Sequence, residues 1–468
     1  MGARQVCAPT PFANPNIRRF LAFRLLFGVR FYYPVFAVLF LDFGLSVGQF
    51  AVLNAVWAAT IVLCEVPSGA LADAMGRRAL VVAAGAIMVV EIALLSFVPL
   101  GNPSLVFAAF LLNRFLSGLA EALASGADEA LAYDSLKATG HAADWPRVLA
   151  MLMRWNSLAF VAALALGALV YDAAALQGLL RGLGWEVTLD PQTTMRFPLY
   201  LTLVTALGAW WAVLGMTEPG ERPARASGLP SSILAAARLT LGTGRWILTT
   251  PFALAVIIGG MLFDHLCRLF VTLNSTYFRL IGLPDASFGL IGAGIALLGV
   301  GIARLAPALG RRSPRFNFVL LALLSLLGLA GAALALPLGL GLPPVVLLQA
   351  VLLLTGYLVS HYLNAVTDSA RRATVLSFKG LVFNLGYGVL GLLYASLLIL
   401  LRDRAGLPAH ELVVFQASLP WLLGYGVFVG LLFIAFAAAR IPTGGFKSLV
   451  VMGLAWWSLG MIVCGRIV

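Results

Sequence analysis

The chain has 468 residues, of which 61% are hydrophobic and only 11% are charged, and its mean hydropathy is +0.98. Soluble domains contain roughly 25% charged residues, so this composition excludes an ordinary water-soluble protein. The formal net charge is +12, but the basic residues stand in short loops between apolar runs, as in membrane proteins. We therefore expect an all-α polytopic membrane protein that has no nucleic-acid partner.

Twelve apolar runs are long enough to cross a bilayer, because a helix needs about 20 apolar residues to span a hydrocarbon core of roughly 30 Å. In chain order the expected helices are about 19–41, 50–72, 79–99, 104–126, 148–171, 197–216, 251–277, 287–309, 316–336, 345–368, 374–401 and 412–439. A kink is expected in the first of them at Pro34. One further apolar run, 448–464, either spans the membrane as an extra helix or lies in the interface.

The polar stretch between the sixth and seventh runs indicates a linker. We expect an N-terminal six-helix bundle at 17–216, a linker at 217–248, a C-terminal six-helix bundle at 249–440 and a tail at 441–468. Most arginines and lysines stand on one set of alternate connections, which should be cytoplasmic. The expected location is the cell (inner) membrane, with the N-terminus and the linker in the cytoplasm.

A compact polar turn, Gly69-Ala-Leu-Ala-Asp-Ala-Met-Gly-Arg-Arg78, separates the second and third runs. Half a chain length later, Leu305-Ala-Pro-Ala-Leu-Gly-Arg-Arg312 repeats most of its pattern, with Pro307 in place of Asp73. A repeat on this scale predicts two structurally related halves.

With these motifs, two groups of six helices resemble the major facilitator superfamily of transporters. The resemblance covers residues from about 17 to 440. Three further blocks, 65–69, 125–131 and 372–377, are similar to one prokaryotic branch. The drug–proton antiporters of the superfamily carry a Gly-Pro-rich motif in helix 5, whereas residues 158–170 contain no proline, which argues against that group.

The resemblance implies a two-bundle fold with a central cavity lined by helices 1, 4, 7 and 10, and transport by alternating access. It also implies that Asp73 latches the cytoplasmic ends of the bundles by its attraction to a helix N-terminus. Pro307 has no carboxylate, so the second copy should latch weakly. The expected latch residues are Glu65, Gly69, Asp73, Gly76, Arg77 and Arg78.

Ionisable residues at membrane depth are costly and usually face the protein interior, so they are the best guide to the cargo. Helix 4 carries a polar stripe that includes Arg114 and Glu121, and helix 10 carries a second stripe at spacings of three and four residues. The substrate-binding candidates are Arg30, Tyr33, Arg114, Glu121, Arg154, Arg268, Tyr357, His361, Asn364 and Lys379. The proton-coupling candidates are Glu121, Asp264, His265 and His361.

Five of these residues are basic and outnumber the acids expected near the midplane, among which Glu91 is one. Guanidinium groups suit carboxylate or phosphate. We therefore expect a monomeric secondary transporter for a small organic anion or amphipathic acid, with proton coupling. For each charged pair, including Asp264 with Arg268, a structural ion pair is the competing interpretation.

Two other function classes stay open. The same fold could export a lipid or a hydrophobic drug. A sensor or membrane enzyme that does not transport is more remote. Its only candidate cluster is the acidic loop of Asp128, Glu129, Asp134, His141 and Asp144, for which a solvated loop with helix caps is the favoured interpretation. The four cysteines lack metal-ligand spacing and no phosphate-binding glycine loop is present. No metal, cofactor or enzymatic activity is expected.

Overall fold

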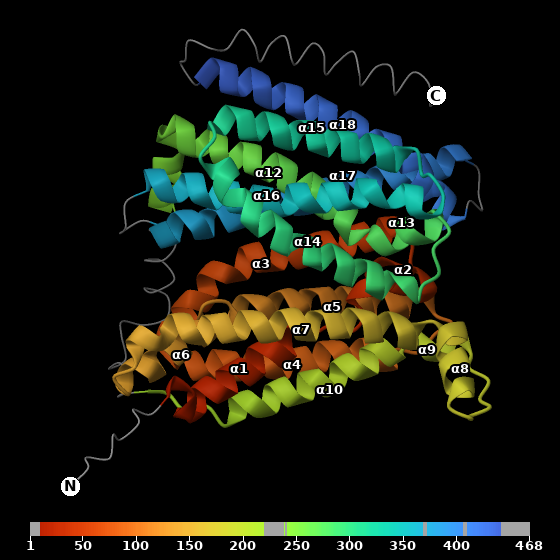
Figure 1. Cartoon of the computed structure of the whole chain (residues 1–468), viewed down its shortest axis with the longest axis horizontal. Coiled ribbons are helices and arrows are strands. Elements are labelled where there is room, and N and C mark those ends of the chain that lie inside the picture. The colour runs from red at the N-terminus through yellow and green to blue at the C-terminus, as the bar shows by residue number, and fades with distance from the viewer. Residues whose placement is uncertain (1–9, 220–237, 239–240, 368–371, 406–409, 441–468) are drawn as a thin grey trace. The chain divides into compact units, whose positions relative to one another are not determined.

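The structure is a computed structural model that describes residues 10–219, 238, 241–367, 372–405 and 410–440, apart from some side chains within helices. All regular secondary structure in these residues is helical (Figure 1). The helices before the expected linker are α1 (Pro15–Gly28), α2 (Phe36–Asp42), α3 (Val47–Met75), α4 (Arg77–Phe97), α5 (Pro103–Ala124), α6 (Ala127–Ala138), α7 (Trp145–Tyr171), α8 (Ala173–Gly182), α9 (Pro191–Thr194) and α10 (Phe197–Leu214).

Residues 241–249, which include the end of the expected linker, are helical. The later helices are α12 (Pro251–Thr272), α13 (Asn274–Leu280), α14 (Ser287–Gly310), α15 (Pro314–Ala333), α16 (Leu342–Val366), α17 (Arg372–Ala405) and α18 (Glu411–Arg440). The short 3₁₀ helices are η1 (Pro11–Ala13), η2 (Tyr33–Val35), η3 (Ala142–Asp144) and η4 (Leu338–Gly341).

Within the described residues, eleven helical stretches are long and apolar enough to cross a membrane. The twelfth is α14, which is bent by 44° between Ser287–Gly299 and Arg304–Gly310. The all-α fold with up to twelve spans agrees with the sequence prediction. The apolar run 448–464 lies outside the described residues, so its two interpretations stay open.

The chain packs into two compact units. The first contains residues 1–33, 63–99 and 108–237, and the second contains 34–62, 100–107 and 238–468. The expected bundle boundaries at 17–216 and 249–440 remain a prediction.

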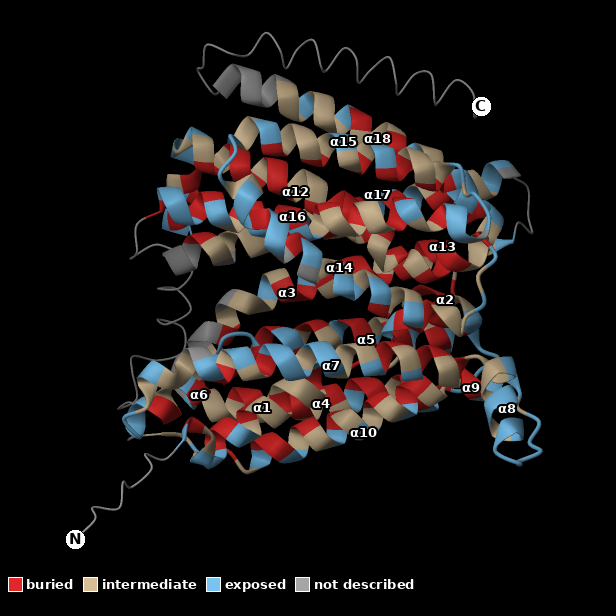
Figure 2. Ribbon diagram, viewed as in Figure 1, coloured by how far each residue is buried: buried red, intermediate tan, exposed pale blue. Residues whose placement is uncertain are grey.

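In the first unit, α10 packs against both α4 and α1, and α1 also packs against α7 (Figure 1). Buried residues recur along α4 at three- and four-residue spacings, as expected of a helix with one face in the core (Figure 2). Gly85 allows close packing, because a Cβ atom there would lie 3.1 Å from the Cα atom of Trp210 on α10.

The first expected helix, 19–41, falls within one candidate span, Pro15–Asp42, but the span is interrupted between Gly28 and Phe36 and is not merely kinked at Pro34. Helix α1 ends at Gly28, before Pro34, and Val29 is extended. The break is tolerated because the hydroxyl oxygen of Thr202 on α10 accepts a hydrogen bond from the Phe31 amide at 3.1 Å. Gly167 on α7 leaves room for the Phe31 carbonyl group, with which any Cβ atom would collide.

In the second unit, α12 packs against α16, α17 and α18, and α15 packs against α16 and α18. The expected helix 251–277 is also broken, since α12 ends at Thr272 and α13 begins after Leu273. The Thr272 hydroxyl donates to the Arg268 carbonyl oxygen at 2.6 Å, a bond within the helix that favours bending. The break accompanies a contact with α2, because Ser275 Oγ accepts from the Ala37 and Val38 amides at 3.0 and 3.2 Å.

A single arginine ties the segment 34–62 to α13. Arg279 donates to both carboxylate oxygens of Asp42 at 2.7 Å each, and its Nε and Nη2 atoms donate to Asp285 at 2.9 and 2.5 Å. We call these three residues the Arg279 clamp. The fork of a guanidinium group suits two carboxylates at once, so Arg279 fixes the position of both.

Candidate functional site

A buried charge network occupies the middle of the first unit. Arg30, just after α1, donates from Nη1 to Glu91 Oε1 on α4 at 3.0 Å, and both side chains are almost fully buried. Asn113 on α5 donates to Glu91 Oε2 at 2.8 Å and to its carbonyl oxygen at 2.9 Å. Arg114, which is 4% exposed, donates from Nε to Asn113 Oδ1 at 3.0 Å. The network therefore contains two arginines and one carboxylate.

Three other candidates in this unit have a different environment. The Tyr33 side chain is 43% exposed and its ring lies 6.4 Å from that of Phe160 on α7. Glu121 on α5 and Arg154 on α7 are exposed. These three side chains are more exposed than those of Arg30 and Arg114.

A second network lies between α12, α16 and α17. Arg268 pairs with Asp264 at 2.6 Å and donates to Asn384 Oδ1 on α17 at 2.9 Å. Its guanidinium carbon lies 5.5 Å from the ring centre of Tyr387. Lys379, also on α17, donates to Ser360 on α16 at 3.3 Å. This network again contains two bases and one acid.

The polar stripe of α16 is more open than these networks. Tyr357, His361 and Asn364 are all exposed, and the rings of Tyr357 and His361 stack with centres 5.9 Å apart and planes 7° apart. The predicted common direction of these residues agrees with this stacking. They form an aromatic and polar surface one residue from Ser360, which binds Lys379.

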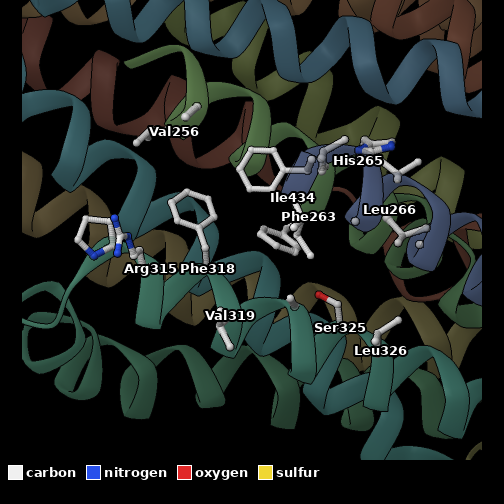
Figure 3. Close-up of a pocket in the computed structure, with 18 of the residues that line it drawn as sticks. Val256, Phe263, His265, Leu266, Arg315, Phe318, Val319, Ser325, Leu326 and Ile434 are labelled. Atoms are coloured by element: carbon white, nitrogen blue, oxygen red, sulfur yellow. The ribbon is translucent and has the colours of Figure 1, made fainter. Parts of the chain in front are cut away.

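His265 faces a different side of α12 from the Arg268 network. Its Nδ1 atom contacts the carbonyl oxygen of Met261, and its Nε2 atom lies 3.0 Å from the hydroxyl oxygen of Tyr425 on α18. Both rings line a cavity of about 500 Å³ between α12, α15 and α18 (Figure 3). Within the second unit, the proton-coupling candidates His265 and Asp264 therefore contact different helices, α18 and α17 respectively, the latter through Arg268.

The latch residues Gly76, Arg77 and Arg78 make contacts within the first unit. Gly76 has a φ of +91° and ends the turn before α4. Arg77 pairs with Asp134 on α6, and Arg78 Nη2 donates to the carbonyl oxygen of Leu214 at 2.9 Å. The basic end of the motif thus joins α4 to α6 and α10.

Glu218 caps the N-terminus of α4, a contact that was not predicted from the sequence. Its two carboxylate oxygens accept hydrogen bonds from the amides of Arg77 and Arg78 at 3.1 and 3.0 Å. A carboxylate at this position satisfies free amides at the N-terminus of α4 and is stabilised by the helix dipole. The sequence signal for this cap is an acidic residue shortly after an apolar run. The polar composition of the same stretch predicts only a linker.

The remaining latch residues are less well defined. Glu65 is half-buried in α3, and its carbonyl oxygen accepts a hydrogen bond from Ser68 at 2.8 Å. Gly69 and Asp73 lie in α3. The side chain of Asp73 is outside the described part of the chain, so its role as a latch stays a prediction. Asp368, at the end of the α16 stripe, is also outside this part.

The acidic stretch after the fourth apolar run is not a solvated loop. Residues 127–138 form α6, and Asp128 is fully buried and pairs with Arg24 at 2.6 Å. Glu129 accepts from the same arginine at 2.9 Å. Within the part of the chain that the structure describes, no three His, Cys, Asp or Glu side chains are grouped to hold a metal ion. These acids therefore connect α6 to α1.

The family model for the Major Facilitator Superfamily matches residues 20–391. Among solved structures, a mutant form of the nucleoside transporter NupG aligns with 91% of this chain and 100% of its own, with a TM-score of 0.66 and 14% identity. A bacterial homolog of the human lysosomal transporter Spinster, inward-facing and unoccupied, aligns with 98% of this chain and 99% of its own (TM-score 0.63, 15% identity).

The D-xylose–proton symporter aligns with 92% of this chain and 99% of its own, with a TM-score of 0.62 and 12% identity. Identities this low establish a shared fold and leave the cargo open. No curated protein matches the chain in sequence.

Proposed function

The chain belongs to the major facilitator superfamily, and from this premise we propose that it is a proton-coupled transporter of a small organic anion or amphipathic acid. Family membership makes it a transporter that works by alternating access, and not an enzyme. The anionic cargo and the proton coupling are the parts that need an argument from this chain's own residues.

The surplus of bases in both networks carries the proposal for an anion. Arg30 pairs with Glu91, and Arg114 joins this network through Asn113. Arg268 pairs with Asp264, and Lys379 donates to Ser360 on the neighbouring helix α16. In each network the bases outnumber the acids, so an anionic group on the cargo would balance the buried positive charge. A carboxylate or phosphate on the cargo supplies that group and binds guanidinium in a bidentate manner.

Pairing reduces the number of bases that are available to a solute. Glu91 and Asp264 neutralise Arg30 and Arg268, so the five bases of the sequence prediction do not all act on the cargo. We propose Arg114 and Lys379, one base from each network that is joined to it by hydrogen bonds to neutral side chains, as the contacts for an anion. The exposed rings of Tyr357 and His361 suit the organic part of the cargo.

Proton coupling rests on carboxylates that are near these bases. Protonation of Asp264 would release Arg268 from its ion pair, which changes the charge of the network by one unit. Glu121 and His361, the other two candidates, have exposed side chains. His265 is the weaker candidate, because its ring is buried against Tyr425 on the other side of α12.

Uptake into proteoliposomes tests the proposal. The full chain is reconstituted with an imposed pH gradient, and a panel of radiolabelled mono- and dicarboxylates and organic phosphates is compared with uncharged sugars and nucleosides. We expect uptake of at least one anion that depends on the gradient. Uptake of only uncharged solutes would overturn the anionic cargo, and uptake that ignores the gradient would overturn the coupling.

Variants in the same assay test which basic residues bind the cargo. Arg114→Gln and Lys379→Gln should raise the KM for the anion by at least about tenfold, since a charged hydrogen bond contributes about 1.5–3 kcal/mol. Arg181→Gln, on the exposed helix α8, removes one positive charge elsewhere and should leave uptake unchanged. If both variants fold and transport normally, the two bases do not bind the cargo.

The alternative cargo is a lipid or hydrophobic drug, and one observation favours it. The cavity between α12, α15 and α18 is lined mainly by apolar side chains. It lies on the His265 side of α12, however, while Asp264 and Arg268 face α17. Transport of a fluorescent lipid between leaflets, insensitive to Arg114→Gln, would favour this alternative.

A further inference from the structure

The cavity between α12, α15 and α18 is a narrow apolar groove that ends in a polar pair. Figure 3 shows Arg315 at one end and His265, Ser325 and Leu326 at the other. Arg315 to Leu326 spans eleven residues of α15, or about 17 Å along the helix axis. This length is close to one half of the roughly 30 Å hydrocarbon core.

The groove is accessible from the outer surface of the second unit. Its lining residues Val319 and Ala322 on α15 and Val429 on α18 are only half-buried. Next to them, Leu323 is 46% exposed and Phe428 is 59% exposed. Apolar side chains that are exposed on spanning helices face lipid, so the groove opens toward the bilayer and can admit a hydrocarbon chain.

Positive charge is concentrated at the end of the groove where α15 begins. Arg315 and Ser313 line the groove, and the exposed Arg311 and Arg312 precede them directly. The N-terminus of α15, capped by the Ser313 hydroxyl, adds the positive end of the helix dipole. An anionic group would be attracted here, at the level of the membrane surface, because α12 and α15 both begin at this end of the groove.

The geometry points to a binding site for an anionic phospholipid, with one acyl chain in the groove and the phosphate on Arg311, Arg312 and Arg315. A cavity of about 500 Å³ is within the range of roughly 300–1,000 Å³ that is typical of small-molecule sites, so it holds one chain. Positive charge at the surface selects anionic over zwitterionic headgroups.

The groove differs from the candidate transport site in place and chemistry. Its deep end is closed by the hydrogen-bonded pair of His265 and Tyr425, which are 3.0 Å apart. The pair satisfies its own polar groups and stops the end of the hydrocarbon chain. The bound lipid therefore connects α12, α15 and α18 along their sides and stabilises the second unit.

Native mass spectrometry of the purified full chain tests the site. The probes are palmitoyl-oleoyl phosphatidylglycerol and phosphatidylcholine, which have the same chains and differ in charge. We expect the wild type to bind phosphatidylglycerol at least about fivefold more tightly, since each basic residue near the surface contributes about 1 kcal/mol, a factor of about five. Equal binding of the two lipids would overturn the proposal.

Two variant pairs assign the headgroup and chain positions. The triple variant R311Q/R312Q/R315Q should lose the preference for phosphatidylglycerol, whereas R18Q/R238Q/R245Q removes three exposed charges elsewhere and should keep it. Ala322→Trp fills the groove and should reduce the binding of both lipids at least about fivefold. If Ala322→Trp does not fold, Val319→Phe serves as a second variant that fills the groove. Leu323→Trp, next to it on the exposed face, should have no effect. The site is overturned if the two triple variants show the same lipid preference, or if Ala322→Trp and Leu323→Trp bind lipid equally well.

A photo-crosslinker identifies the occupant in the intact protein. Ala322 is replaced by p-benzoylphenylalanine, and the full chain is irradiated in vesicles that contain phosphatidylglycerol. The expected product carries the mass of one phospholipid. A crosslink to the peptide 448–464 instead would show that the chain's own apolar tail fills the groove, and would overturn the proposal.

Discussion

Glu91 is the acid that holds the buried arginines of the first unit in place. It accepts from Arg30 and Asn113, and through Asn113 it orients Arg114. The sequence identified all three ionisable residues as membrane-buried, but it could not show which of them pair. Pairing depends on the break after α1, which brings Arg30 to the level of Glu91.

Removing the charge of Glu91 should destabilise the protein. In Glu91→Gln, Arg30 stays buried without a carboxylate, and breaking a buried ion pair costs about 3–5 kcal/mol. We expect a lower midpoint in thermal unfolding followed by fluorescence in detergent. The double variant Arg30→Gln/Glu91→Gln should recover part of the loss, because it leaves no unpaired charge. A double variant less stable than Glu91→Gln would contradict the pairing.

Glu218 makes a separate prediction at the N-terminus of α4. Glu218→Ala removes the acceptor of two amide hydrogen bonds and should cost about 0.5–2 kcal/mol of stability, as is typical for the loss of a cap. Glu218→Gln keeps an acceptor but loses the charge, so it should cost less. The measurement is thermal unfolding at low and high salt. Equal stability of wild type and Glu218→Ala would show that the cap is unnecessary.

At the scale of elements, apolar length predicted where the helices lie, and side-chain detail decided where they break. The breaks after Gly28 and Thr272 fall inside continuous apolar runs, so hydropathy could not reveal them. At the first break, the hydroxyl groups of Thr202 on α10 and Ser275 on α13 accept hydrogen bonds from the amides of Phe31, Ala37 and Val38. A threonine in one apolar run carries no sequence signal of its partner in another.

Gly167 tests the contact that accompanies the first break. Gly167→Ala places a methyl group on the Phe31 carbonyl oxygen, so α7 and the broken segment must separate. We expect a loss of about 1–3 kcal/mol, the usual cost of overpacking. Gly178→Ala in α8 is the matched control, because its Cβ atom meets nothing within 4 Å, and it should be neutral or stabilising. The two variants are compared by thermal unfolding, and equal stability would contradict the close contact.

At the scale of the whole molecule, composition and the repeated motif were sufficient to predict the fold, because each span must satisfy its own backbone in lipid. Which segments of the chain pack together in one compact unit could not be predicted in the same way. Residues 34–62 belong to the first apolar runs, yet they pack in one unit with residues 238–468. The sequence motif predicts a latch at Asp73. It does not predict the Arg279 clamp, because the two acids of the clamp, Asp42 and Asp285, are far apart in the sequence.

The Arg279 clamp predicts how firmly segment 34–62 is held. Arg279→Gln loses the ion pairs to Asp42 and Asp285, so the amides of this segment should exchange with deuterium at least about tenfold faster, as a loss of about 1.4 kcal/mol implies. Peptides from α15 serve as the internal control and should keep their exchange rates. Arg279→Lys retains the charge without the fork and should show an intermediate increase.

Hydrogen–deuterium exchange of the reconstituted full chain makes this comparison, peptide by peptide. If Arg279→Gln leaves segment 34–62 as protected as in the wild type, the Ser275 hydrogen bonds and apolar packing hold it without the clamp. An increase that also extends over α15 would mean that the second unit as a whole is destabilised. Only an increase confined to the segment shows that the clamp is a local contact, of the kind that alternating access must form and break in each cycle.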